Sequence, residues 1–169
     1  MRKAQVVFVV VFVLVFVGAS ASAQRSAKSR AGILCPDPTV ACRTSVEFQP
    51  YQLPFRVPST TVIYETEPFY AVILKSMRDA SEGADCNVFV PETDRLAAQS
   101  LFPHNKVFAS RCFESGDLYY TNVAHDRQFM AVYAGHTLAE AKAMLAKVRA
   151  TGKYPGANLR RMRAGLNGT

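Results

Sequence analysis

The chain has 169 residues, of which 49% are hydrophobic and 20% are charged, and 20 Lys and Arg residues outnumber 13 Asp and Glu residues. This length and composition exclude a large multidomain enzyme, a disordered chain and a collagen-like protein, and they predict one small basic domain. The surplus of positive charge favours anionic partners.

Residues 1–23 have the pattern of a secretory signal peptide. Arg2 and Lys3 precede an apolar run over residues 6–17, and small residues lead to Ala23. As a helix, this run would rise about 18 Å, which is short of the roughly 30 Å of a bilayer core, so cleavage is favoured over anchoring. We expect cleavage after Ala23, with Ala21 as the alternative. The mature chain, with a net charge of +5 instead of +7, would have no stable membrane span and be periplasmic or secreted.

Residues 24–67 are expected to form an irregular arm, because they contain five prolines and few periodic runs. The arm holds Cys35 and Cys42, and the other two cysteines are Cys86 and Cys112. An even number of cysteines in an exported protein predicts two structural disulfides, and the sequence leaves three pairings open. The short spacing favours a local Cys35–Cys42 loop, with Cys86–Cys112 as the longer bridge. A zinc site would need closer cysteine pairs, so we expect no metal and no cofactor.

Two segments rich in β-branched and aromatic residues share the motif Phe-x-Ala-Val, and each is followed by a helical segment and a short strand. The first half comprises residues 69–75, 92–102 and 106–111, and the second comprises residues 129–135, 138–150 and 157–163. The common order of strand, helix and strand indicates two βαβ halves.

The second helix has the clearest boundaries. Thr137 and Glu140 have the spacing of a capping box at its start. Gly152 suits the left-handed residue after the last turn, and Pro155 prevents continuation. We therefore expect this helix to begin beside Thr137 and to end before Gly152.

The two halves predict an α+β fold, a ferredoxin-like βαββαβ sandwich in which one sheet carries both helices on one face. This domain would span residues 68–164, between the irregular N-terminal arm and a polar tail over residues 165–169. The opposite face of the sheet is expected to be open, and it must meet solvent, the arm or a ligand.

Strand alternation places Val72 and Val132 toward the helices, and it places Ile73, Lys75 and Tyr133 on the open face. Two arginines follow each other on the last strand, so at most one of them reaches that face. A tyrosine ring is suited to stacking on a sugar. The candidate ligand-binding residues are Ile73, Lys75, Tyr133, Arg160 and Arg161.

The second half resembles a SPOR domain, from the family of sporulation-related repeats that bind peptidoglycan. The resemblance rests on the following residues: Val132-Tyr133-Ala134-Gly135, Ala139-Glu140-Ala141, Leu145 and Gly152. It extends to the whole of residues 68–164. The family often has Gln where Ile73 aligns and Gly where Lys75 aligns. The resemblance implies a periplasmic, non-catalytic module that binds peptidoglycan glycan strands, stripped of stem peptides, along the open sheet face.

Positive charge is concentrated at the C-terminal end, where seven basic residues face a single acid, Glu140, from residue 139 onward. They are Lys142, Lys147, Arg149, Lys153, Arg160, Arg161 and Arg163. Such a patch attracts peptidoglycan or another anionic cell-envelope polymer without choosing among them. The alternative is an exported protein-interaction or inhibitor module, in which this surface and the arm hold an acidic protein partner. A nucleic-acid partner is not expected.

A small secreted nuclease is the weaker alternative. His104, His125 and His136 are the only histidines, and two of them with a lysine would supply a general base, a general acid and a phosphate contact. Each histidine lies at a predicted turn, which suits a surface residue. The chain also lacks the HExxH, GxSxG and DxD motifs. We therefore expect no catalysis.

Overall fold

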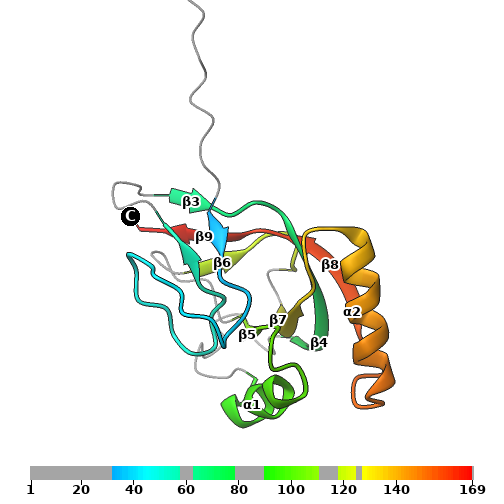
Figure 1. Cartoon of the computed structure of the whole chain (residues 1–169). Helices are drawn as coiled ribbons and strands as arrows, with labels where there is room; N and C mark the ends of the chain where they lie inside the picture. Colours follow the sequence, from blue (N-terminus) through cyan, green and yellow to red (C-terminus); the bar gives the residue numbers. More distant parts are fainter. Residues whose placement is uncertain (1–31, 58–62, 79–89, 111–117, 125–126, 169) are drawn as a thin grey trace, which may run out of the picture.

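A computed structural model describes residues 32–57, 63–78, 90–110, 118–124 and 127–168 (Figure 1). The predicted signal peptide, Cys86 and Cys112 lie outside these ranges. The described chain contains two helices, α1 (Glu92–Leu101) and α2 (Leu138–Ala150), and its paired strands are antiparallel, so the predicted α+β class is confirmed. Neither helix is long and apolar enough to cross a bilayer.

The largest sheet is built from the two predicted halves. Its strands are β4 (Phe69–Arg78), β5 (Val107–Ala109), β7 (Arg127–Tyr133) and β8 (Asn158–Met162). They lie in the order β5-β7-β4-β8, so the first strand of each half is central. The two Phe-x-Ala-Val motifs are neighbours there, with Val72 opposite Val132.

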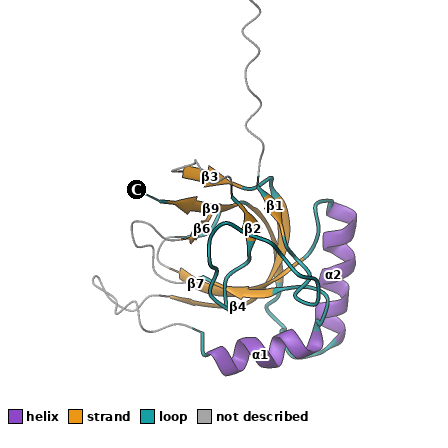
Figure 2. Cartoon of the chain, turned by 60° about the vertical axis from the view of Figure 1, so that its left-hand side comes forward, coloured by secondary structure: helices purple, strands orange, loops and turns teal. Residues whose placement is uncertain are grey.

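Both helices cover the same face of this sheet (Figure 2). The core beneath them contains Val72 and Val132, as alternation predicts, together with Ala98 and Phe102 near α1 and Val148 of α2. Apolar burial of this kind contributes about 1.5–3 kcal/mol for each large side chain.

The predicted boundaries of α2 are also confirmed. Glu140 N–H donates to Thr137 Oγ1, Thr137 N–H donates to Glu140 Oε2 at 2.8 Å, and Gly152 has a φ of 66°.

The other face of the sheet is not open, and this prediction is wrong. Ile73 and Tyr133 are each only 7% exposed, in a core that also contains Phe69, Phe108 and Phe129 from the sheet. The arm and a second sheet cover that face and contribute their own apolar side chains to this core: Leu34, Leu53, Phe55, Val57, Tyr64, Tyr120 and Ala164. Burial of such an aromatic face against other chain segments is favourable, because it removes a large apolar surface from water.

The second sheet has the order β3-β9-β6, with β3 (Ile63–Glu65), β9 (Ala164–Asn167) and β6 (Leu118–Tyr120). Its central strand covers most of the predicted polar tail, so that prediction is also wrong. Only Arg163 separates β8 from β9, which means that the chain passes directly from one sheet to the other. At this corner Thr66 N–H donates to Ala164 O at 2.8 Å, and Arg163 Nη1 donates to Thr66 O at 2.6 Å.

The arm packs across the face of the sheet and is hydrogen-bonded along the edge of β5. Its short strands β1 (Ile33–Leu34) and β2 (Phe55–Arg56) pair with each other. Ala109 N–H of β5 donates to Tyr51 O at 2.8 Å, and Lys106 N–H donates to Pro36 O at 2.7 Å. These bonds hold the arm against the edge of β5, where it shields the aromatic core.

Candidate functional site

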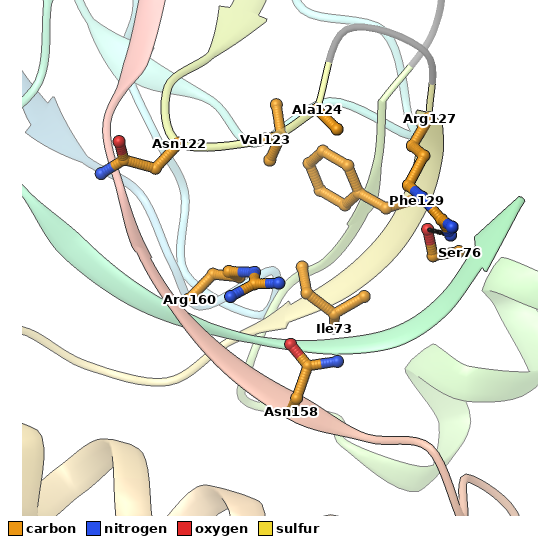
Figure 3. A pocket seen from close by; sticks show the side chains of 9 residues that line it. All are labelled: Ile73, Ser76, Asn122, Val123, Ala124, Arg127, Phe129, Asn158 and Arg160. Atoms are coloured by element: carbon orange, nitrogen blue, oxygen red, sulfur yellow. Dashed lines mark hydrogen bonds between the residues drawn. The ribbon is translucent and has the colours of Figure 1, made fainter. Parts of the chain in front are cut away.

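One part of the covered face remains accessible as a cleft of about 370 Å³. It lies between β4, β7 and β8 on one side and residues 121–124 on the other (Figure 3). The lining residues are Ile73, Ser76, Asn122, Val123, Ala124, Arg127, Phe129, Asn158 and Arg160. The volume is near the lower end of the range for small-ligand sites, about 300–1,000 Å³.

Two guanidinium groups give the cleft a positive potential. Arg127 begins β7, and its Nη1 donates to Ser76 Oγ at 3.4 Å. Arg160 is exposed on β8 and forms no ion pair with any residue that the structure describes. Planar guanidinium groups bind carboxylates through two parallel hydrogen bonds, so the cleft suits an anionic ligand.

The other lining residues combine amides with apolar groups. Asn122 has a φ of 58°, a left-handed conformation that Asn tolerates better than most residues. Its Nδ2 donates to Arg161 O at 2.9 Å, which ties the loop to β8, while Asn158 Nδ2 donates to Gly156 O at 3.2 Å. Ile73 and Phe129 form an apolar wall. Charged, amide and apolar groups together can recognise a ligand with a carboxylate, hydroxyls and one apolar face.

The structure brings two of the five predicted ligand-binding residues together, since Ile73 and Arg160 both line the cleft. Arg161 points the other way, because it lies opposite Tyr70, which packs on the helix side, whereas Arg160 lies opposite Ala71. The expectation that only one of the two arginines reaches this face is therefore confirmed.

Tyr133 is not available for stacking on a sugar. Its ring packs against Phe69 at a centroid distance of 5.8 Å, and the side chain is buried. Burial raises the pKa of Tyr133 from 10.0 to about 12. The tyrosine thus belongs to the core beneath the arm.

Lys75 lies on the helix side, contrary to the prediction from alternation. A β-bulge between Ile73 and Lys75 inserts Leu74, so that Lys75 comes opposite Met130 of the helix-side core. Lys75 Nζ then donates to Asp94 Oδ2 at 2.9 Å. One inserted residue reverses the face of every side chain after it, which is why Ser76 rather than Lys75 follows Ile73 into the cleft.

The sequence prediction missed Ser76, Asn122, Arg127 and Asn158 as lining residues. Arg127 lies two residues after His125, at one of the turns predicted from the sequence, and a basic residue beside a turn is common on any surface. Asn122 and Asn158 lie far apart in the sequence, and only the approach of residues 121–124 to β8 brings them to one cleft.

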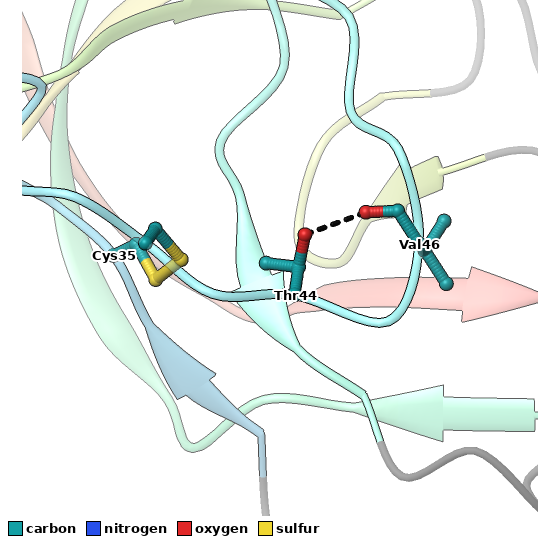
Figure 4. Close-up of a disulfide and its surroundings, with 4 residues drawn as sticks. Cys35, Thr44 and Val46 are labelled. Atoms are coloured by element: carbon teal, nitrogen blue, oxygen red, sulfur yellow. Dashed lines mark hydrogen bonds between the residues drawn. A yellow bond between two sulfur atoms is a disulfide. The ribbon is translucent and has the colours of Figure 1, made fainter.

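The predicted disulfide between Cys35 and Cys42 is present (Figure 4). Beyond the loop that it closes, Thr44 Oγ1 donates to Val46 O at 2.6 Å. A structural disulfide is consistent with an oxidising compartment.

The described histidines do not converge. His104 Nδ1 lies 3.4 Å from Asp37 Oδ2 of the arm, whereas the His136 ring packs beside Tyr133 at a centroid distance of 5.9 Å. Neither lines the cleft, and His125 lies outside the described ranges. Within those ranges, no cluster of three His, Cys, Asp or Glu side chains could hold a metal ion.

Lys106 has an altered basicity but also lies away from the cleft. Burial lowers its pKa from 10.5 to about 8, and the nearby Arg95 charge acts in the same direction. Its Nζ donates to Pro50 O at 2.6 Å, which adds to the attachment of the arm.

Among the described residues, the cleft is the site whose chemistry best supports a functional assignment. No protein-family model, no curated protein and no solved structure matches this chain.

Proposed function

We propose that this chain is an exported, non-catalytic binding module that takes an end or a short segment of an anionic cell-envelope glycan, peptidoglycan in the first place, into the cleft. The observation that carries the proposal is the convergence of Arg127, Arg160, Asn122 and Asn158 around the apolar wall of Ile73 and Phe129. The arrangement offers charge pairing, hydrogen bonding and apolar contact within about 370 Å³.

The chemistry of the ligand fits these groups. Glycan strands stripped of stem peptides expose the lactyl carboxylate of each muramic acid, and a guanidinium group is the side chain best shaped to bind a carboxylate. Side-chain amides both donate and accept, so they match sugar hydroxyls. The apolar wall suits the C–H face of a sugar ring.

The strand order supports the SPOR-like interpretation. In a ferredoxin-like sheet the first strand of each βαβ half is central, as β4 and β7 are here. The mode of binding differs from the one that the resemblance implies, because the arm covers most of the face along which a glycan would lie. The ligand is therefore a short segment held in the cleft.

Periplasmic or extracellular localisation is part of the proposal. It is supported by the signal-like pattern of residues 1–23 and by the disulfide between Cys35 and Cys42.

Binding to sacculi tests the proposal, and the two consecutive arginines of β8 provide a matched pair of variants. Amidase-treated sacculi, which lack stem peptides, should retain the protein better than intact sacculi. Arg160→Glu reverses a charge in the cleft and should lower retention at least about tenfold, as expected for the loss of a charge-assisted contact. Arg161→Glu makes the same change outside the cleft and should alter retention less than about twofold. Equal retention by both kinds of sacculi, abolished by moderate salt, would leave only charge attraction and contradict the proposal.

A further inference from the structure

Among the residues that the structure describes, only half of the outer edge of β4 is covered. This strand runs over Phe69–Arg78, but β8 pairs with residues 69–73 alone. Residues 75–78 pair with β7 on the opposite edge, and no described strand pairs with the outer edge beyond Ile73. In Figure 3 the arrow of β4 continues past the point where β8 turns away. An uncovered strand edge of this kind is a template for another extended segment.

Ser76 directs its backbone groups toward this uncovered edge. The backbone N–H and C=O of its partner Phe129 point away from β4. Ser110 N–H donates to Phe129 O at 2.9 Å, and Phe129 N–H donates to Ser110 Oγ at 2.8 Å. Opposed residues in an antiparallel pair either exchange both hydrogen bonds or neither. Ser76 and Phe129 are therefore a pair without hydrogen bonds, and the N–H and C=O of Ser76 point outward.

Accessible cavities flank the same edge on both faces of the sheet. The cleft with Ser76 and Arg127 lies on one face. On the helix side, a groove of about 330 Å³ runs from β7 across β4 to the turn before β8. Its lining residues are Leu74, Lys75, Met130 of the sheet, Asp94 and Ala97 of α1, and Lys153, Tyr154 and Pro155 of the turn. Side chains of a strand alternate between faces, so one added strand would reach both cavities.

The charges at the edge indicate what kind of segment fits. Arg127 and Arg160 lie on the cleft side, and Lys153, which has no ion-pair partner among the described residues, lies on the groove side. A second copy of this chain would bring these cations against one another, which disfavours self-pairing. An acidic strand would instead gain from them.

We propose that an extended acidic segment of a partner protein adds to the sheet along residues 74–78 of β4. The residue opposite Ser76 exchanges two backbone hydrogen bonds with it and carries a carboxylate that meets Arg127 in the cleft. The residues before and after are apolar, and they enter the groove over Leu74 and Tyr154. Main-chain bonds supply affinity in this mode, while pockets for alternate side chains supply specificity. The inference goes beyond glycan binding and does not depend on it.

The probe is the pentapeptide acetyl-Thr-Val-Glu-Val-Thr-amide, titrated into the full mature chain and followed by amide resonances. Backbone amides of residues 75–77 should shift, and hydrogen exchange at Ser76 should slow. Methylation of the backbone nitrogen of the central Glu removes a strand hydrogen bond without changing the charge, and it should weaken binding at least about tenfold. Replacement of that Glu by Lys should weaken binding by a similar factor.

Two lysines provide the matched variants. Lys153→Glu places a negative charge at the groove and should weaken peptide binding at least about fivefold, whereas Lys142→Glu on the exposed side of α2 should change it less than about twofold. Neither lysine lines the cleft, so sacculus retention tests the glycan proposal independently.

Three results would overturn the inference. Equal binding of the methylated and unmethylated peptides would exclude strand addition, and unchanged resonances at millimolar peptide would exclude this kind of ligand. Slow exchange at Ser76 in the free protein would mean that the edge is already held. Dependence of that protection on protein concentration would identify the occupant as a second copy, and independence would identify it as another segment of the same chain.

Discussion

Gly165, on the central strand of the second sheet, lies beneath the ring of Tyr119. Tyr119 of β6 is its cross-strand partner, and the Tyr119 hydroxyl donates to Glu65 Oε1 of β3 at 3.1 Å. The ring therefore crosses over the central strand, and a Cβ at Gly165 would come within 2.5 Å of Tyr119 Cε2. Only a residue without a side chain fits beneath the ring.

We accordingly predict that Gly165→Ala destabilises the protein by about 1–3 kcal/mol, because the ring must move and its bond to Glu65 is lost. Gly156→Ala is the matched control, since nothing lies within 4 Å of a Cβ there, and it should change stability by less than about 0.5 kcal/mol. Urea unfolding measures both values. Equal stability of the two variants would show that the Tyr119 ring moves aside without cost.

The hydroxyl of Tyr133 provides a second prediction at this scale. Burial raises its pKa from 10.0 to about 12 in the folded protein, so the folded state favours the neutral phenol. This contribution to the free energy of unfolding is fully present below pH 10 and is lost as the pH rises toward about 12. A Tyr133→Phe variant has no such loss. Its stability relative to the parent should therefore rise between pH 10 and 12 and be independent of pH between 7 and 9.

Denaturant unfolding at a series of pH values measures this difference. Parallel profiles of parent and variant up to pH 12 would contradict the burial of Tyr133 beneath the arm.

Among the elements, local sequence determines the ends of α2 but not the position of the arm. The capping residues Thr137 and Glu140 and the terminal Gly152 are close to α2 in the sequence, so local interactions fix its ends. The arm has no such local signals. Its position depends on contacts with distant residues, among them the bond from Leu53 N–H to the Tyr120 hydroxyl at 3.2 Å.

The arm should therefore behave as part of the core. Leu53 is fully buried, and we predict that Leu53→Ala lowers the free energy of unfolding by about 2–5 kcal/mol. Ile33 on the same arm is 61% exposed, and Ile33→Ala should cost less than about 0.5 kcal/mol. Thermal or denaturant unfolding compares them. A small effect of Leu53→Ala would mean that the arm detaches from the sheet without loss of the fold.

Across the whole molecule, β4 couples the two hydrophobic cores. Ala71 and Ile73 belong to the core beneath the arm, while Val72 and Leu74 belong to the core beneath the helices. Neither core can lose its packing without disturbing this central strand. The two cores should therefore unfold together.

We predict a single cooperative transition with no populated intermediate. Near-ultraviolet circular dichroism reports the buried Tyr120 and Tyr133, and far-ultraviolet circular dichroism reports mainly α1 and α2. The two signals should give coincident unfolding curves. An earlier loss of the tyrosine signal would show that the arm and the second sheet form a separate unit.

The candidate site shows the same division between local and distant information. Alternation correctly groups Ile73 with Tyr133 and allows only one of Arg160 and Arg161 on their side of the sheet, because the period of a strand is a local property. It fails at Lys75, since a bulge depends on how two strands pair. Alternation also does not predict that the arm buries Tyr133 while the cleft stays accessible.

The sequence alone predicted the two βαβ halves, the boundaries of α2 and the local disulfide, and it placed Val72, Val132, Ile73 and Tyr133 on the correct sides of the sheet. All of these depend on residues within one turn, one strand period or one short loop of each other. Only the tertiary structure decided that the second face is covered, that residues 164–167 form a central strand and that Arg127, Asn122 and Asn158 meet at one cleft. These features depend on the packing of apolar surfaces from distant parts of the chain. The hydrophobic effect that drives this packing is not directional, so the sequence does not show which surfaces will meet.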